Sequence, residues 1–465
     1  MKTTATLLGT GILFALAHNP TAFADDSTSL QRLEAELAAL KTRVEAQDTE
    51  LQRLRATDES DSWLDERRAE EVRALVNETL ADADGRSQAV QAGYNRGYFI
   101  RSDDGNHELR LGIVGQVRYI QNQRREADDR DTGGFQFRRL QTDFQGHFIN
   151  PNWTYRLRLD SSNGGSVSAA WAWIGYRFND DLSIRVGQLK PSFLHEENVG
   201  APNQLAAERS YTADYFTTKF AQGVQLAWQP WDRLRLTGTV HNGSYNARTD
   251  FNNEGTNIAL TGRAEYLLVA DDVSRGWRQF GDYQSWSGDQ VAVLLGAAAD
   301  YEWGRTRNDF NRPDVFKWTG DVTAKLNGFS MFGSITGQRF SADSLNGLPD
   351  NLDGALQWGA VVQAAAFVVP DKVELFGRYE WIDFDNVYYR NNAGGIQGGS
   401  RDLTQRDVSL LTVGANYYLH RHNAKLTFEV VYALDPVPVA NTGQGLLISE
   451  TGDQLAARAQ LQFRF

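Results

Sequence analysis

Arginines recur on the polar side of alternating stretches in the first half of this sequence. They are Arg110, Arg118, Arg139, Arg156, Arg158, Arg185, Arg233 and Arg235. If these stretches are β-strands, successive side chains point to opposite faces, so the arginines share one face of a sheet. A guanidinium stays charged and presents a fixed fork of donors, which can replace the water that an anion loses in a narrow passage. Rings of Arg or Lys are expected in anion pores, so the pattern indicates anion passage.

A second interpretation of these arginines is also open. They could pair with Glu108, Asp143 and Asp160 and do no more than solvate a protein wall. Surface ion pairs of this kind are common and carry little energy, so they would imply no function.

The other reactive residues form no catalytic or metal-binding pattern. The chain has no Cys, which excludes disulfides and cysteine-ligated metals. His420 and His422 straddle a turn without metal-ligand spacing, and Glu196-Glu197 is a doublet whose neighbouring side chains do not face one substrate. The formal net charge of −12 argues against general nucleic-acid binding. We therefore expect no enzymatic activity and no cofactor.

The stretches that carry the arginines alternate apolar and polar residues. Trp153–Asp160, for example, places Trp, Tyr and Leu at odd positions and Thr, Arg and Asp at even ones. In a soluble sandwich the polar face meets water, whereas in an outer-membrane barrel it lines the lumen and the apolar face meets lipid. Three features favour the barrel: links alternate short and long, aromatic residues cluster near strand ends, and the chain stops on Phe465. The mean hydropathy of −0.48 fits a wall that shows lipid only every second side chain.

We therefore predict an all-β fold, an antiparallel transmembrane β-barrel of about sixteen strands, preceded by an N-terminal coiled-coil helix. The strands are expected near 106–123, 135–149, 152–161, 167–178, 182–190, 219–229, 233–243, 257–269, 289–303, 314–326, 329–340, 354–367, 372–384, 405–420, 423–434 and 453–465. The link 271–288 is too long for the side of the barrel where the other turns are short. Either it enters the lumen or it contains an unrecognised pair of strands.

The sequence predicts four parts. Residues 1–24 have the pattern of a signal peptide, with Lys2 before a short apolar run and cleavage near Ala24. Residues 25–57 predict a coiled-coil helix that self-associates, with two and three strands both open. Residues 58–96 form a polar spacer and residues 97–465 the barrel, which predicts a bacterial cell outer membrane location. The heptad residues are Leu30, Leu33, Leu37, Leu40, Val44, Gln47, Leu51 and Leu54.

Several motifs in the first half resemble the phosphate-selective porin O/P family. They are Phe135–Phe148, "AWIGYRF" at 172–178, "IRVGQLKPSF" at 184–193 and Glu208-Arg209-Ser210. The resemblance implies a homotrimer of sixteen-stranded barrels in outer-membrane lipid, each conducting small anions past an inward-folded third external loop. That loop is 191–218 here, and the matched positions at its start and end make Lys190 and Arg209 the expected anion contacts. A second interpretation of Arg209 is open, in which it braces Glu208 or the barrel wall.

The combined expectation is a passive porin for small anions, with phosphate as the suspected solute and with a constriction formed by loop 191–218 and the arginine face. Acid-rich loops and few lysines argue against strong phosphate specificity. Two alternatives stay open: a general, weakly selective porin, and a structural barrel that tethers the envelope through its coiled coil. The sequence also leaves open whether Glu196 and Glu197 offset the basic residues of the loop.

Overall fold

The chain divides into two units, Met1–Gln88 and Ala89–Phe465, and each is considered by itself. The computed structural model describes residues 38–39, 41–47, 49, 68–78, 90–94, 97–125, 130–161, 166–244, 256–304, 306–307, 310–311, 313–341, 354–384, 388–390, 396–398, 407–449 and 452–465.

The first unit is helical where it is described. Residues 41–47 and 68–78 are helical, and Val44, a predicted seam residue, is 58% exposed. The predicted signal peptide and the seam residues other than Val44 and Gln47 lie outside the described residues, so cleavage and the coiled coil stay predictions. Among the described residues, no helix is long and apolar enough to cross a membrane.

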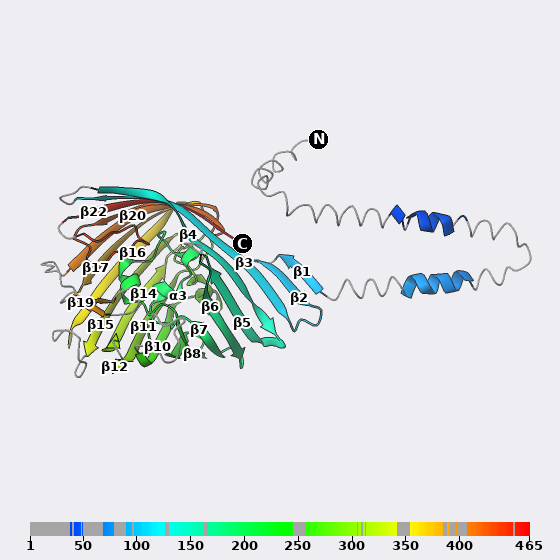
Figure 1. The fold of residues 1–465 in the computed structure, drawn as a ribbon, viewed down its shortest axis with the longest axis horizontal. Helices are drawn as coiled ribbons and strands as arrows, with labels where there is room; N and C mark the ends of the chain where they lie inside the picture. The colour runs from blue at the N-terminus through cyan, green and yellow to red at the C-terminus, as the bar shows by residue number, and fades with distance from the viewer. Residues whose placement is uncertain are drawn as a thin grey trace, which may run out of the picture. The chain divides into compact units, whose positions relative to one another are not determined.

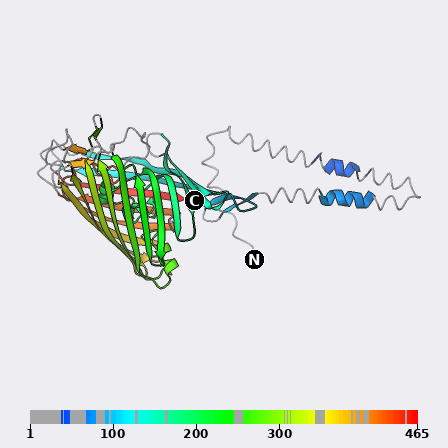
Figure 2. The same ribbon diagram turned by 90° about the horizontal axis from the view of Figure 1, so that it is seen from below.

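The second unit is a closed antiparallel barrel of sixteen strands (Figure 1). The ring closes because the last strand pairs with the first along its length, from Gln454 opposite Arg124 to Arg464 opposite Val114. Figure 2 shows the strands inclined to the barrel axis. The barrel strands are β3 (Glu108–Arg124), β4 (Arg130–Phe148), β5 (Asn150–Asp160), β6 (Ser168–Arg177), β7 (Leu182–Leu189), β8 (Ala221–Trp231), β9 (Leu234–His241), β10 (Thr256–Val269), β11 (Ala292–Gly304), β14 (Asp314–Lys325), β15 (Phe329–Ser341), β16 (Leu356–Val369), β17 (Val373–Asp383), β20 (Asp407–His420), β21 (Ala424–Ala433) and β22 (Gln454–Arg464).

Three hairpins accompany the barrel. β1 (Val90–Tyr94) and β2 (Tyr98–Ser102) extend the sheet from the start of β3, so a strand lies within the segment 58–96 predicted as spacer. The other two hairpins form sheets of their own: β12 (Thr306–Arg307) with β13 (Phe310–Asn311), and β18 (Tyr388–Arg390) with β19 (Ile396–Gly398).

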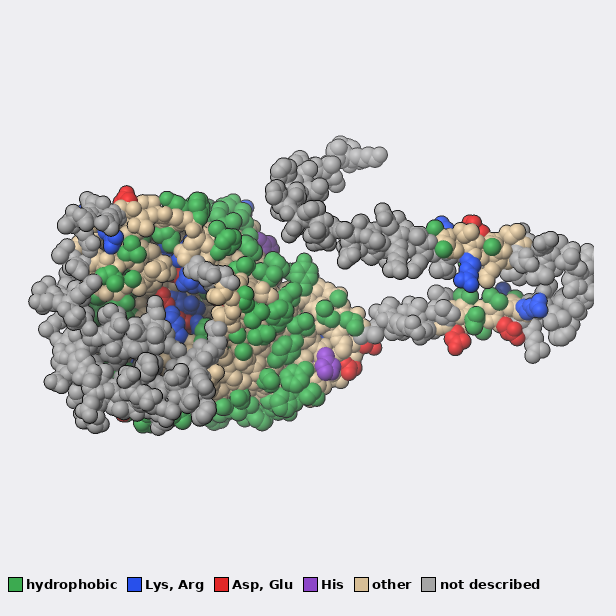
Figure 3. Space-filling view, in the orientation of Figure 1, with side chains coloured by type: hydrophobic (Ala, Val, Ile, Leu, Met, Phe, Trp, Pro, Cys, Tyr) green, Lys and Arg blue, Asp and Glu red, His purple; other side chains and the backbone are tan. Residues whose placement is uncertain are grey.

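The prediction of an antiparallel barrel with sixteen strands is confirmed. Each expected segment corresponds to one barrel strand, and the largest difference is at β4, which begins at Arg130 rather than near 135. Large apolar side chains such as Leu226 and Trp228 stay exposed on the outer face, as a lipid-facing wall requires. In Figure 3 hydrophobic side chains spread over the outer surface, while Lys, Arg and acidic side chains lie within the hollow of the barrel.

The link between β7 and β8 folds inward and packs on the inner wall. It begins at Lys190-Pro191, where proline lacks the N–H that a strand ladder needs. It contains α3 (His195–Asn198), the 3₁₀ turn η1 (Ala201–Asn203) and α4 (Tyr211–Phe216). Its apolar residues form two clusters against the wall: Phe193, Leu194, Tyr211 and Phe216 with Ile382, Val408, Leu410 and Val431, and Val199, Leu205 and Ala206 with Phe332, Val361 and Phe376. We call residues 190–220 the inner loop.

The link 270–291 also folds inward and contains no strand. It carries the helix α5 (Val273–Gln279), and its Tyr283 joins the second apolar cluster beneath the inner loop. The sequence left two alternatives for this link, a turn that enters the lumen or an unrecognised pair of strands, and the structure shows the first.

Candidate functional site

Glu208 fixes the inner loop to the barrel wall through three arginines. Its carboxylate accepts from Arg118 at 2.9 Å, from Nε of Arg138 at 2.6 Å and from Arg139 at 2.7 Å. The side chains of Arg118, Arg139 and Glu208 are 0%, 8% and 2% exposed. Burial would raise the pKa of Glu208, but the charges of Arg138, Arg139 and Arg118 outweigh it and hold that pKa well below its ordinary value. Arg118 and Arg139 are thus occupied in anchoring.

Lys190 and Arg209 have their charges matched inside the inner loop. Lys190 donates to Glu197, whose carboxylate also lies 3.7 Å from Arg209 and 3.9 Å from Lys219. Arg209 further donates to the carbonyl oxygens of Glu196 and Val199, each at 2.9 Å. Burial would raise the pKa of Glu197, but Arg209, Lys190 and Lys219 lower it overall.

Glu196 is buried as well and bonds within the protein. It accepts from the backbone N–H of Ser210 at 2.5 Å and from the Ser210 hydroxyl at 2.6 Å, and it lies 3.8 Å from Arg378 of β17. The carboxylates of Glu196 and Glu197 are therefore turned into packed protein rather than toward open space, and Glu197 offsets Lys190 and Arg209 within the loop.

The inner wall is covered unevenly. From β10 to β22 most inward charged residues are buried, including Arg263, Lys317, Arg378 and Arg458. The wall is more open at the start of β3 and in the second half of β5, since the side chains of Arg110, Arg156 and Arg158 are 32%, 24% and 18% exposed.

The open part of the wall carries more guanidinium groups than carboxylates. Nε of Arg156 and of Arg158 each donates to Asp143 at 2.9 Å, so two arginines share one acid. Glu108 is shared in the same way by Arg101 and Arg110. The side chain of Arg185 makes no ion pair or hydrogen bond within the described part of the chain, and its guanidinium lies over the ring of Trp173, 4.9 Å from the centroid.

Arg233 and Arg235 hold the inward link 270–291. Arg233 donates to the carbonyl oxygens of Leu267 and Ala270 at 3.1 and 3.0 Å. Arg235 lies over the ring of Trp277 in α5 at 4.0 Å. Both of these predicted solute contacts are therefore engaged with the base of the link.

Lys325 and His422 anchor the far end of the same link. Lys325 Nζ donates to Asp282 at 2.6 Å, and His422 Nε2 lies 2.9 Å from the other oxygen of that carboxylate. Burial would raise the pKa of Asp282, yet Lys325 and His422 lower it overall. Burial lowers the pKa of His422 to about 4 despite Asp282.

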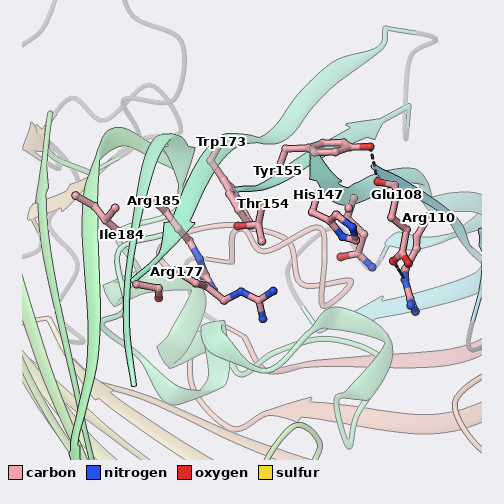
Figure 4. Close-up of a pocket in the computed structure, with 12 residues that line it drawn as sticks. Glu108, Arg110, His147, Thr154, Tyr155, Trp173, Arg177, Ile184 and Arg185 are labelled. Carbon is pink, nitrogen blue, oxygen red and sulfur yellow. Dashed lines mark hydrogen bonds and ion pairs between the residues drawn. The ribbon is translucent and has the colours of Figure 1, made fainter. Parts of the chain in front are cut away.

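Two cavities lie along the open wall. One of about 350 Å³ is lined by residues of β3 to β7, with Arg110 and Glu108 on one side and Arg177 and Arg185 on the other (Figure 4). The second, of about 970 Å³, lies between the link and β3 to β5. Its lining includes Arg156, Arg158, Arg275, Arg278, Arg421 and Arg464.

Sequence reasoning did not select Arg275, Arg278, Arg421 or Arg464 as site residues. It also did not predict that Arg138 binds Glu208. Arg275 and Arg278 stand in "SRGWRQ", a segment with visible charge but with no pattern that says where the link folds. Arg464 lies on the predicted polar face of the last strand and could have been found from the alternation that revealed the others.

A closed barrel with sixteen antiparallel strands and a polar lumen is the architecture of outer-membrane porins. Residues 112–267 match the family model described as phosphate-selective porin O and P, which confirms the resemblance over that range. No curated protein matches the sequence.

Solved structures share the fold at low identity. The anion-selective porin from Comamonas acidovorans is 11% identical with a TM-score of 0.50, covering 77% of this chain and 99% of that one. The outer membrane channel DcaP of Acinetobacter baumannii is 13% identical with a TM-score of 0.49, covering 80% and 100%. OmpT of Vibrio cholerae is 12% identical with a TM-score of 0.46, covering 76% and 98%.

Proposed function

We propose that this porin conducts small anions passively, through a passage between the inner loop and the arginine-bearing wall of β3 to β7. The observation that carries the proposal is the excess of guanidinium groups on the open wall. Arg156 and Arg158 share Asp143, while Arg185 has no carboxylate partner in the described part of the chain. A positive, narrow lumen concentrates anions and repels cations.

The predicted site residues divide into two roles under this proposal. Arg110, Arg156, Arg158 and Arg185 contact the solute, because their side chains reach open space on the wall. The remaining six are positioning residues: Arg118, Arg139, Lys190 and Arg209 hold the inner loop, and Arg233 and Arg235 hold the link 270–291. The inner loop then forms the constriction by standing opposite the solute contacts.

Phosphate is a candidate solute, supported by the family match over 112–267 and by the fork geometry of arginine. A general, weakly selective anion porin is the alternative, favoured by the absence of lysine among these four solute contacts. Chloride current measured in the presence of millimolar phosphate separates the two: a block supports a phosphate site, and unchanged current supports the general porin.

Planar-bilayer recording tests the function itself. Purified protein should give discrete conductance steps, and a salt gradient should give a reversal potential that favours anions over cations. Three equal sublevels would support a homotrimer. A protein that inserts but conducts at no voltage would contradict the porin and favour an envelope tether through the predicted coiled coil.

A further inference from the structure

The cavity lined by β3 to β7 combines cationic and aromatic side chains. The ring of Trp173 lies on its wall together with Thr154, Arg177 and Arg185, and Arg110 faces them from β3 (Figure 4). Its volume of about 350 Å³ suits a small organic molecule. A tryptophan facing the lumen is unexpected in a barrel, because aromatic rings normally gather at the lipid interfaces.

A glycine lets Arg185 reach this tryptophan. Thr154, Gly175 and Arg185 are aligned across β5, β6 and β7. A Cβ atom at 175 would lie only 3.1 Å from Cγ of Arg185 and 3.1 Å from the hydroxyl of Thr154. Because glycine has no side chain there, the stem of Arg185 passes close over β6, and its guanidinium lies 4.9 Å from the centroid of the Trp173 ring.

Three donor groups in this cavity, on Trp173, Arg177 and Arg185, lack a carboxylate partner within the described residues. The indole Nε1 of Trp173 is buried and makes no hydrogen bond, and Arg185 makes none within the described residues. Arg177 donates to the carbonyl oxygen of Pro151 and has no carboxylate partner in the same residues. An unpaired buried donor such as the indole N–H of Trp173 is costly, and two guanidinium groups without a carboxylate partner lie in the same cavity, so the site favours an anionic ligand that accepts hydrogen bonds.

We propose that this cavity is a binding subsite for carboxylates that carry a flat aromatic ring. The carboxylate accepts from Arg185 and Arg177, and the ring packs beside the indole of Trp173. An inorganic anion could accept hydrogen bonds from the guanidinium groups and from the indole N–H, whereas an aromatic ring adds a packing contact with the indole ring that an inorganic anion cannot make. The inference rests on the proposed function, since it names a solute class for the same lumen.

Isothermal titration calorimetry on the full chain in detergent tests the subsite without requiring conductance. The probes are benzoate and cyclohexanecarboxylate, which share charge and carbon number but differ in aromaticity. Benzoate should bind about threefold or more tightly than cyclohexanecarboxylate. Trp173→Leu should remove this preference, and Arg185→Gln should weaken both ligands. Equal affinities in the unmodified protein, or an unchanged preference in Trp173→Leu, would overturn the subsite.

Two further variants separate local geometry from general charge. Gly175→Val should displace Arg185 and weaken both ligands while Trp173 is retained. Arg278→Gln, an exposed arginine of α5 outside this cavity, should leave the preference for benzoate unchanged, and a loss there would point to general charge and contradict the subsite. If bilayers show anion conductance but calorimetry shows no preference, the subsite fails and the porin stands. If calorimetry shows the preference for benzoate but bilayers show no conductance, the subsite stands and the porin function fails.

Discussion

Replacing Glu208 by Gln is the sharpest test of how the lumen is organised. The substitution keeps the size of the side chain but removes the charge that Arg118, Arg138 and Arg139 share. Arg118 and Arg139 would remain buried without a counter-charge from the inner loop. Breaking a buried ion pair by removing one partner costs about 3–5 kcal/mol, and Gln retains some of the hydrogen bonds, so we expect the lower end of that range.

The cost should appear as weaker docking of the inner loop. Other contacts still hold the loop, among them the Thr212 N–H that donates to Glu380 and the Arg378 guanidinium that donates to the carbonyl oxygen of Glu208. The loop should therefore fluctuate rather than leave the lumen. We expect noisier open-channel current, a changed single-channel conductance and faster cleavage by added protease within 190–220.

Asp180→Asn is the matched control, because Asp180 is an exposed turn residue that also loses one negative charge. Equal conductance, current noise and protease resistance in Glu208→Gln and the unmodified protein would refute the anchoring role.

Low pH should have the same effect as the Glu208→Gln substitution. Since the pKa of Glu208 is lowered from 4.5 in the folded state, its stabilising charge is fully present above 4.5 and is lost as pH falls below that value toward the folded pKa.

Three more outcomes follow from the same contacts. Replacing both Arg156 and Arg158 by Gln should move the bilayer reversal potential toward zero selectivity, and an unchanged potential would place the filter elsewhere. Burial lowers the pKa of His422 from 6.5 to about 4, so the unfolded state binds the proton more readily than the folded state. Protonation of His422 should therefore weaken the anchoring of the link 270–291 as pH falls from 6.5 to 4. Protease cleavage within the link should then increase over that pH range, and His422→Gln should remove this part of the pH dependence. Deleting Ser27–Ala56 should lower the oligomer mass in native mass spectrometry if the predicted coiled coil holds the assembly, whereas an intact oligomer would assign that role to the barrel.

The alternation of side chains made the barrel predictable. A strand has a period of two whatever its partners, so Trp153–Asp160 shows its two faces in the sequence itself. Strand ends were also legible where turn chemistry is strong, as at Lys190-Pro191 and at Asn327, which adopts a positive φ of 51°. The start of β4 was harder to predict from the sequence. The strand begins at Arg130 and passes through Gly133 and Gly134, which give no alternation of apolar and polar side chains.

The site was predictable only as a set of residue types. Alternation correctly placed Arg118 and Arg156 on the polar face, but it treated them alike. The structure buries Arg118 against Glu208, ninety positions away along the chain, and leaves Arg156 partly exposed beside Asp143. No local pattern can distinguish the two, because the difference depends on where the inner loop lies.

By itself, the sequence determined the class of fold, the polarity of the lumen and the position of the long inner loop, since these depend on local periodicity and on turn residues. Only the tertiary structure decided which arginines stay accessible, that the link 270–291 turns inward, and that Gly175 brings Arg185 onto Trp173. These features depend on side chains meeting from distant strands and loops. Their pairing is governed by burial and by the proximity of opposite charges, and both arise only when the ring of strands is complete.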